Sequence, residues 1–574
     1  MKLRSFLPVI ALSLSAANAY ASAHKCLPKF TVISAAAVAT SATTIVAAST
    51  PNTSAAVTTT NDVQNSTTTT TTSPVITTTT NLVVATTTTV TPAITTTNLV
   101  ATTSTTLTDA VPAPVTTADV VPSITETTTT TTFAALIPAT TTAVSTGSGS
   151  CSNPSITVTN INVGESINVN EDDAGSSIIS ISSIPSGGSR IAYATTGGTI
   201  KVVTLNADDT INTSVATVTV DVVDFADLYA DDTGFVILGT RDAEGGGTLN
   251  CGNPSNLCGT APNPAIPCYD MYLIRFDGST EIWATKLTSS SASLPPYSTS
   301  STGPEVYMIW WYAHQGQIAF DGANWGAYFG AAISVSQGGC INIHQGDRMK
   351  VVGPLGEIVS SVDSFDWGCS HSGYERLVYD ARVGHFVMIC KTDNNDQLMF
   401  PDTYNTIYPV DLWYSDLGGI ALDSGSGGYW ASVSNIHAGQ PADASGNADV
   451  HLIHFTKTAV ASGVDADIVL AAGSVTTNAR APHIAALGSD ASSILVAWET
   501  ATSAGELQQG NTGRVLWVQV VSATDGSAVS NPVTVSAAGN RYSFFKTAHD
   551  GSVAYPAQAL DSDSAINVVR VASC

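Results

Sequence analysis

Pairs of short apolar runs separated by polar turns recur between residues 180 and 574. "DDTGFVILGTRD" (Asp231 to Asp242) has close counterparts in "YDARVGHFVMICKTD" (Tyr379 to Asp393), "LDSGSGGYWASVSN" (Leu422 to Asn435) and "GSDASSILVAWET" (Gly488 to Thr500). The runs alternate and are rich in β-branched residues, with Asp, Gly and Ser between them, which is typical of β-hairpins. No stretch has a sustained 3.6-residue apolar period, so the pattern predicts strands rather than helices.

Seven such units can be aligned, and most are followed by a second pair of strands. The units begin near Ser180, Asp227, Gly316, Glu375, Gly418, His483 and Ser543. A four-stranded antiparallel unit repeated roughly every 40 to 50 residues is typical of β-propellers. Insertions such as 243–268 and 288–303 explain the longer intervals. We therefore predict an all-β fold, a seven-bladed β-propeller; a pair of stacked β-sandwich domains is the alternative.

The last unit, residues 541–574, contains three strand-like pieces where four are needed. A further strand-like piece, Ser155 to Val163, precedes the first unit. We expect it to pair antiparallel with the final strand, because this closes the ring and removes an exposed edge. Such pairing would bring Cys151 beside Cys574, and we predict a disulfide between them; pairing of Cys151 with Cys26 is the alternative.

The N-terminal region differs in composition, so the sequence divides into three parts. Lys2 and Arg4 precede an apolar run at 6–17 and small residues suited to cleavage, which predicts a secretory signal peptide at 1–23. A Thr-rich low-complexity segment follows at 24–150, and the propeller domain occupies 151–574. The apolar stretch at 30–49 is mostly Ala diluted by Thr and Ser, so no membrane insertion is expected.

The Thr-rich segment predicts a disordered, extended stalk. Between residues 41 and 150, 43 of 110 positions are Thr and none is Lys or Arg. An unmodified, uncharged segment rich in β-forming residues aggregates readily. In a secreted protein, dense O-glycosylation of Thr prevents this aggregation. We therefore predict a mucin-like stalk, with an unmodified linker as the alternative. N-glycosylation acceptor patterns begin at Asn52, Asn65 and Asn212.

Charge narrows the range of partners. The formal net charge is −25 at pH 7, and the first 150 residues contribute as many acids as bases. An acidic domain of this kind does not fit nucleic acid or an anionic membrane. It fits calcium, a cationic partner or simply a solvated extracellular surface, so we expect no cofactor other than calcium.

Eight of the nine cysteines lie in the propeller domain. In an exported chain an even number of cysteines indicates disulfides, and the spacing here fits no standard zinc site, so no metal centre is expected. Apart from Cys151 and Cys574, the sequence leaves the pairing open for Cys251, Cys258, Cys268, Cys340, Cys369 and Cys390.

One stretch carries a resemblance to known proteins. "YLIRFDGSTEIWATKL" (Tyr272 to Leu287) resembles the repeats of secreted bacterial β-propeller proteins, in which a strand, an Asp-Gly turn and a Trp-bearing strand recur. The resemblance extends over 151–574 as a blade pattern. It implies the fold and transfers no catalytic residue.

An aromatic-rich region in the third and fourth units is the candidate ligand surface. Eight of the 23 residues from 307 to 329 are aromatic, and polar residues lie among and after them. Sugar recognition uses such aromatic platforms with carboxylate and amide hydrogen bonds, although aromatic residues also fill the space between blades. The candidate residues are Trp311, His314, Asp321, Asn324, Trp325, His344, Asp347, His371, Glu375 and Arg376.

Three functions fit the sequence. The first is a secreted or cell-surface glycoprotein whose propeller binds an extracellular glycan or protein. The second is a glycan-cleaving enzyme, with Asp321, Asp347 and Glu375 as candidate acid and base. The third is a structural coat or matrix component. A long stalk favours a non-enzymatic role, and the chain contains neither a Gly-x-Ser-x-Gly elbow nor a His-Glu-x-x-His motif.

Overall fold

The computed structural model describes residues 78–87, 96–105 and 153–572, with gaps at 172–176, 243–267, 289–305, 310–315, 338–339, 370–373, 394–395, 411–413, 426, 443–444, 458–462 and 508–512. Only the backbone is described at 78–87, 96–105, 242, 268, 306–309, 333–337 and 340–345. The chain separates into two units, 1–138 and 139–574. None of the described elements is a helix with the length and hydropathy of a membrane span.

The first unit contains one described hairpin. Strand β1 (Thr78–Thr87) pairs antiparallel with β2 (Thr96–Thr105), and Val83 lies opposite Val100. The two strands carry the two copies of an Asn-Leu-Val half-repeat, so the copies face each other in the ladder. The signal peptide and the rest of the predicted stalk, including Asn52 and Asn65, lie outside the described residues.

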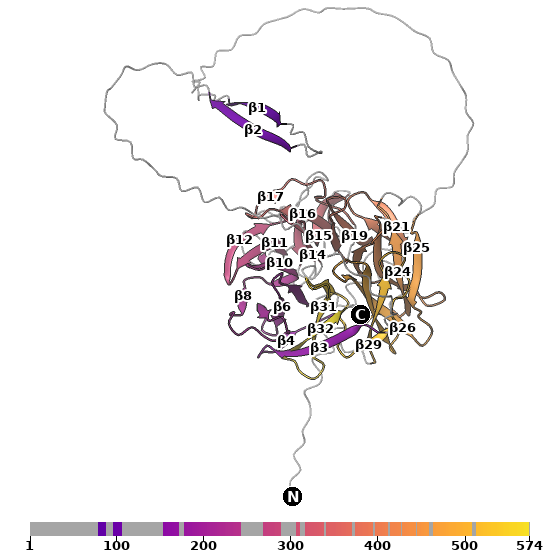
Figure 1. Cartoon of the computed structure of the whole chain (residues 1–574). Coiled ribbons are helices and arrows are strands. Elements are labelled where there is room, and N and C mark those ends of the chain that lie inside the picture. Colours follow the sequence, from indigo (N-terminus) through magenta and orange to yellow (C-terminus); the bar gives the residue numbers. More distant parts are fainter. Residues whose placement is uncertain are drawn as a thin grey trace, which may run out of the picture. The chain divides into compact units, whose positions relative to one another are not determined.

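The second unit is a seven-bladed β-propeller (Figure 1). The first strands of the blades are β5 (Ile179–Ser183), β9 (Asp224–Ala230), β14 (Gly316–Phe320), β18 (Arg376–Asp380), β22 (Leu417–Leu422), β26 (Asn478–Leu487) and β30 (Lys546–Thr547). Each first strand contacts the next, and β30 contacts β5, so these strands form a closed inner ring. All seven lie at or within a few residues of the predicted starts, which confirms the predicted fold.

Three further strands complete each blade in antiparallel order. The second strands are β6 (Ser189–Thr195), β10 (Gly234–Asp242), β15 (Trp325–Gln337), β19 (His385–Thr392), β23 (Tyr429–Ile436), β27 (Ser493–Ala501) and β31 (Val553–Gln558). The third strands are β7 (Ile200–Leu205), β11 (Cys268–Asp277), β16 (Cys340–Val352), β20 (Gln397–Phe400), β24 (Ala448–Phe455), β28 (Val515–Ser522) and β32 (Ala565–Ala572). The fourth strands are β8 (Val218–Val220), β12 (Thr280–Lys286), β17 (Ile358–Val359), β21 (Asn405–Pro409), β25 (Ala466–Ala471), β29 (Val533–Val535) and β3 (Ser155–Asn162).

Two strands depart from the regular blade. Strand β4 (Ile167–Asn168) pairs with β6 beside β5, so two short pieces share the inner edge of blade 1. Strand β13 (Val306–Ile309) pairs with both β11 and β15, so blades 2 and 3 form one nine-stranded sheet. The sequence pattern predicted neither strand.

Aspartates in the turns explain why the pattern of Asp231 to Asp242 recurs along the sequence. The Asp231 carboxylate accepts hydrogen bonds from the backbone N–H groups of Thr233 and Gly234 (2.9 and 2.8 Å) in the β9–β10 turn. Such a side chain replaces the backbone partner that a tight turn lacks. Equivalent aspartates accept a backbone N–H in the first turn of five other blades: Asp321, Asp380, Asp423, Asp490 and Asp550. The repeat is therefore a turn motif.

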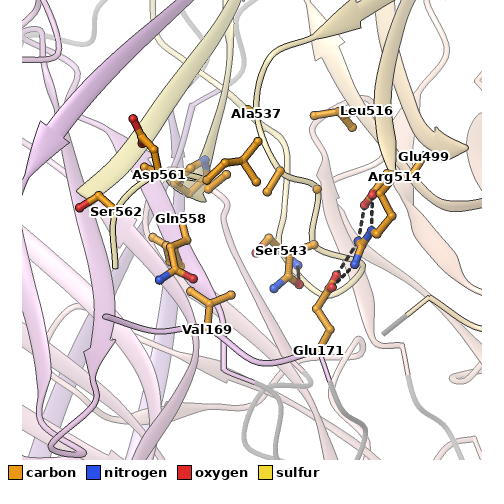
Figure 2. A pocket seen from close by; sticks show the side chains of 18 of the residues that line it. Val169, Glu171, Glu499, Arg514, Leu516, Ala537, Ser543, Gln558, Asp561 and Ser562 are labelled. Carbon is orange, nitrogen blue, oxygen red and sulfur yellow. Dashed lines mark hydrogen bonds and ion pairs between the residues drawn. The ribbon is translucent and has the colours of Figure 1, made fainter. Parts of the chain in front are cut away.

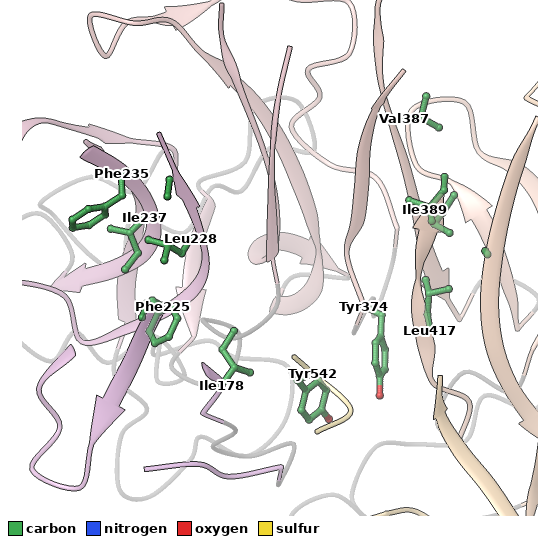
Figure 3. Close-up of a cluster of buried hydrophobic side chains, with 14 of the residues drawn as sticks. Ile178, Phe225, Leu228, Phe235, Ile237, Tyr374, Val387, Ile389, Leu417 and Tyr542 are labelled. Carbon is green, nitrogen blue, oxygen red and sulfur yellow. The ribbon is translucent and has the colours of Figure 1, made fainter. Parts of the chain in front are cut away.

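Aromatic residues close the axis of the ring. Tyr374 precedes the first strand of blade 4 and Tyr542 precedes that of blade 7, and their rings stack with centroids 5.6 Å apart (Figure 3). These blades lie on opposite sides of the ring, so the pair spans the axis. Buried apolar side chains of blades 1, 2, 4 and 5, such as Ile178, Phe225 and Ile389, belong to the same cluster.

Asp227 joins four blades near this axis. Its buried carboxylate accepts hydrogen bonds from Ser180 Oγ of blade 1 (2.9 Å) and from the backbone N–H of Ile318 of blade 3 (2.9 Å). Lys546 of blade 7 forms an ion pair with the same carboxylate. Since Asp227 belongs to blade 2, one side chain ties the first three blades to the last.

The N-terminal strand closes the propeller as predicted. Strand β3 pairs antiparallel with β32, with Ser155 opposite Ala572 and Asn162 opposite Ala565. Asn160 Nδ2 also donates to Asn567 Oδ1 across the pair (2.9 Å). Cys151 and Cys574 lie just beyond the described ends of these strands, so the disulfide between them stays a prediction.

Deletion of residues 151–165 should expose the β32 edge. Because an unpaired edge strand templates association, we expect the truncated protein to aggregate or to lose cooperative unfolding. Size-exclusion chromatography and thermal melts measure this. Non-reducing peptide mapping of the intact protein should also find Cys151 and Cys574 in one linked peptide. A truncated protein that stays monomeric and equally stable would contradict the closure.

Replacing Asp227 with Asn should lower the free energy of unfolding by about 3 kcal/mol, because Lys546 loses its buried counter-ion. Denaturant unfolding gives the change. Asp525→Asn, at an exposed aspartate in the β28–β29 turn, is the control and should leave the midpoint unchanged. Equal stability of both variants would show that the axis does not depend on this ion pair.

Candidate functional site

A cavity of about 690 Å³ opens between blades 6, 7 and 1. Its walls come from the β4–β5 connection (Val169, Glu171), the start of β28, the β29–β30 connection at 537–543, and the end of β31 with its following loop at 556–563. Each of these segments lies at a connection between the second and third strands of a blade, or between the last strand of one blade and the first strand of the next. In an antiparallel blade they lie on one face of the ring, opposite the Asp turns. We call this cavity the blade 6/7 pocket.

Arg514 holds two buried carboxylates on one side of the pocket. It donates to Glu171 Oε1 (2.9 Å) and to Glu499 Oε2 (2.6 Å), as Figure 2 shows. Burial alone would lower the pKa of Arg514, but the two carboxylates outweigh burial and raise it. Burial raises the pKa of Glu499 despite its bonds to Arg514. Arg514 therefore stays charged, and its bidentate geometry fixes both acids.

Glu171 also connects the pocket to blade 7. It accepts the backbone N–H of Arg541 at Oε1, and its carbonyl oxygen accepts Arg541 Nη2 (both 2.9 Å). Gly539 lies against the Glu499 carboxylate, where an added Cβ would come within 1.8 Å of Oε1. A larger residue at position 539 would therefore require the Glu499 side chain, which Arg514 holds, to shift.

Polar side chains on the other walls are not locked in this way. Asn540, 4% exposed, accepts the backbone N–H of Tyr542 (2.9 Å) at Oδ1, whereas no acceptor among the described residues lies within reach of its Nδ2. Gln558, Asp561 and Ser562 lie across the cavity from Arg514 (Figure 2). Aliphatic surface comes from residues such as Val169, Leu516 and Leu560. The pocket thus combines hydrogen-bonding groups with small apolar patches.

Blades 6 and 7 share a buried aromatic cluster. His483 is fully buried against Phe545, with ring centroids 4.8 Å apart, and Phe545 stacks on Tyr555 at 4.3 Å. Burial lowers the pKa of His483 to about 3, so its imidazole is neutral at physiological pH.

The structure gives packing roles to several residues of the sequence-predicted ligand surface. Trp325 is 6% exposed and lies against Phe320 and Trp283, with centroids 5.1 and 5.9 Å away. Asp321 caps its turn by accepting the backbone N–H and the side-chain amide of Asn324 (2.6 and 3.1 Å). These three residues lie at the turn face, away from the blade 6/7 pocket.

The remaining described candidates are interior. Asp347 is fully buried and accepts the hydroxyl of Tyr328; burial, together with the charge of Glu375, raises its pKa well above the usual range. Arg376 donates to the carbonyl of Leu417 (3.0 Å), and burial lowers its pKa to about 10. Trp311, His314 and His371 lie outside the described residues, and only the backbone of His344 is described.

The structure contains one disulfide that the sequence alone did not assign. Cys369 and Cys390 form a disulfide with their Cα atoms 6.5 Å apart, a normal separation. Asp347 lies close enough to both sulfur atoms for a three-ligand metal site. Because the sulfur atoms bond to each other, they are not available as thiolate ligands.

Sequence reasoning missed the pocket because its lining has no motif. The walls contain no aromatic residue, and the segment "SAAGNRYS" (Ser536 to Ser543) consists mainly of small and polar residues. The sequence gives one indication of this wall. The segment is too rich in Gly and Ala for a strand, which indicates a connection between strands, and it contains Gly539, which lies against the Glu499 carboxylate.

Neither a protein-family model nor a curated protein matches the chain. Similar solved structures include the WD40 domain of Toxoplasma gondii coronin, at 8% identity and a TM-score of 0.35, covering 73% of this chain and 87% of that one. Aleuria aurantia lectin in complex with alpha-methyl-L-fucoside matches at 10% identity and 0.28, covering 70% and 93%. Trypanosoma rangeli sialidase with the inhibitor DANA matches at 10% and 0.30, covering 60% and 58%. The strand order of the chain itself therefore defines its class, a seven-bladed β-propeller protein.

Trp325→Ala should lower the free energy of unfolding by about 3–5 kcal/mol, because it removes a large packed ring from the interface of blades 2 and 3. Asp321→Ala should cost about 1 kcal/mol, the value of one turn cap. Thermal or denaturant unfolding measures both. If Trp325→Ala kept full stability, the ring would be available for a ligand and the packing role would be wrong.

Proposed function

We propose that this protein is a secreted or cell-surface glycoprotein whose propeller is a binding head for an extracellular carbohydrate, presented on an O-glycosylated stalk. The observation that carries the proposal is the blade 6/7 pocket. Its volume falls in the usual range for small-ligand sites, and its walls combine amide, hydroxyl and carboxylate groups with aliphatic patches.

The chemistry of the pocket suits a sugar. Each sugar hydroxyl donates and accepts, so its site needs both kinds of partner. Asn540 Nδ2 is a donor, Asp561 is an acceptor, and the amide of Gln558 is both. Aliphatic side chains such as Leu516 can pack against the C–H face of a sugar ring.

Features outside the pocket support an extracellular setting. The Cys369–Cys390 disulfide fits an oxidising compartment. Asn212, an N-glycosylation acceptor by sequence, lies in the β7–β8 connection at partly exposed positions, where a glycan has room. The Thr-rich composition of 41–150 supports the stalk.

The enzyme alternative has less support. Asp321 caps a turn and Asp347 is buried inside the domain, so they do not face a common cavity. In the pocket itself, Glu171 and Glu499 are both held by Arg514. All four of their carboxylate oxygens accept hydrogen bonds from Arg514, so both acids are engaged in this ion network and neither is free to act on a substrate.

A glycan array probed with the full-length protein tests the binding function. We expect binding to a defined set of saccharides, weakened about tenfold by Gln558→Ala because hydrogen bonds to the ligand are lost. Asn324→Ala, a matched amide on the opposite face, should leave binding unchanged, and both variants should keep the wild-type melting temperature. If no saccharide binds, a structural coat or matrix role is favoured. If Asn324→Ala weakens saccharide binding and Gln558→Ala does not, the binding site lies in the aromatic region around Trp325.

Deglycosylation tests the stalk. Because O-linked sugars add mass and extend the chain, the native protein should migrate far above its 58.9 kDa chain mass and return toward it after O-glycan removal. Gel electrophoresis with mass spectrometry of the Thr-rich peptides gives the answer. Native protein already at its chain mass would contradict an O-glycosylated stalk.

A further inference from the structure

The charge of the blade 6/7 pocket identifies the kind of sugar it takes, an inference that rests on the proposed function. Four carboxylates line the cavity, Glu171, Glu499, Asp561 and Asp563, and Arg514 is the only cation among its lining residues, all of which the structure describes. The lining therefore carries three more negative than positive charges. A neutral saccharide does not need this excess, and an anionic saccharide is repelled by it.

The excess negative charge lies at the rim of the pocket. Glu171 and Glu499 share the guanidinium of Arg514, so these three groups form a closed ion network on one wall. Asp561 and Asp563 belong to the β31–β32 loop and are both exposed. Asp563 Oδ2 accepts the hydroxyl of Ser166 (2.8 Å), a neutral partner that leaves its charge uncompensated. Two carboxylates two residues apart thus flank the cavity with no cation among its lining residues to balance them.

The interior offers the opposite kind of group. Asn540 is buried, lines the cavity and has a side-chain N–H₂ without an acceptor among the described residues. A buried donor of this kind costs free energy unless a ligand or a water accepts from it. It calls for an oxygen of the ligand, whereas the rim calls for a positive charge.

We propose that the pocket binds a saccharide with a free ammonium group, of the glucosamine type. A ring oxygen or hydroxyl accepts from Asn540 Nδ2, and the ammonium donates to the carboxylates of Asp561 and Asp563. Both groups occur on one amino sugar. N-acetylation removes the charge, so it converts the ligand into a matched neutral probe.

Calorimetric titration of the full-length protein at pH 6, where an amine is protonated, tests the proposal. We expect a glucosamine trimer to bind at least about tenfold more tightly than an N-acetylglucosamine trimer. Raising the salt from low to molar concentration should reduce this difference, since exposed charges are screened. A lysine tripeptide, which offers ammonium groups without the sugar ring, should bind more weakly than the glucosamine trimer.

The double variant Asp561→Asn and Asp563→Asn should bring the two trimers to within about twofold of each other and leave N-acetylglucosamine binding as it was. The double variant Asp277→Asn and Asp525→Asn, at exposed aspartates in the β11–β12 and β28–β29 turns on the opposite face, is the charge-matched control and should change neither affinity. Circular dichroism melts confirm that each variant is folded.

The outcomes separate this inference from the function on which it rests. Equal binding of both trimers, or a preference for glucosamine that survives the double variant, overturns the inference while a carbohydrate function stands. Lysine tripeptide binding as tightly as glucosamine also overturns it and indicates a protein partner. If no saccharide on the array binds and neither trimer does, the proposed function itself fails.

Discussion

The pairing of β3 with β32 is the interaction on which the rest of the domain depends. It joins positions 407 residues apart, as the Asn160–Asn567 hydrogen bond illustrates. Each propeller blade packs its two faces against the two neighbouring blades, so an open ring would leave two faces and one edge exposed to solvent. The Asp227–Lys546 ion pair between blades 2 and 7 and the Tyr374–Tyr542 stack across the axis both require the closed ring.

The pocket depends on the same closure. Glu171 follows β3 in the chain, yet its partners Arg514 and Arg541 lie 343 and 370 residues away. Blade 6 supplies Glu499, and blade 7 supplies Gln558 and the acidic loop. The pocket therefore lies where the two ends of the domain meet, and its geometry depends on the pairing of β3 with β32.

The sequence predicted the blades well because local rules determine them. Alternating apolar runs, and turn aspartates such as Asp231 and Asp490, act over a few residues, so their repetition is visible without a structure. Strands β4 and β13 were missed because they are short and are defined by partners elsewhere in the chain. The aromatic signal around Trp325 indicated a sugar platform, whereas the structure shows an interface between blades. Aromatic composition alone does not distinguish a ring that faces solvent from one that packs against the next blade.

Closure by a strand from the start of the domain also orders the events of biosynthesis. Strand β3 precedes blade 1 in the chain, but its partner β32 belongs to the last blade, so β3 is synthesised long before the strand with which it pairs. Contacts of such high sequence separation form late and slowly, since a long loop must be closed before they are gained. Blades 1 to 6 can assemble in the meantime, while β3 waits as an unpaired strand. The pocket therefore forms only in the final step of folding, after the individual blades have assembled.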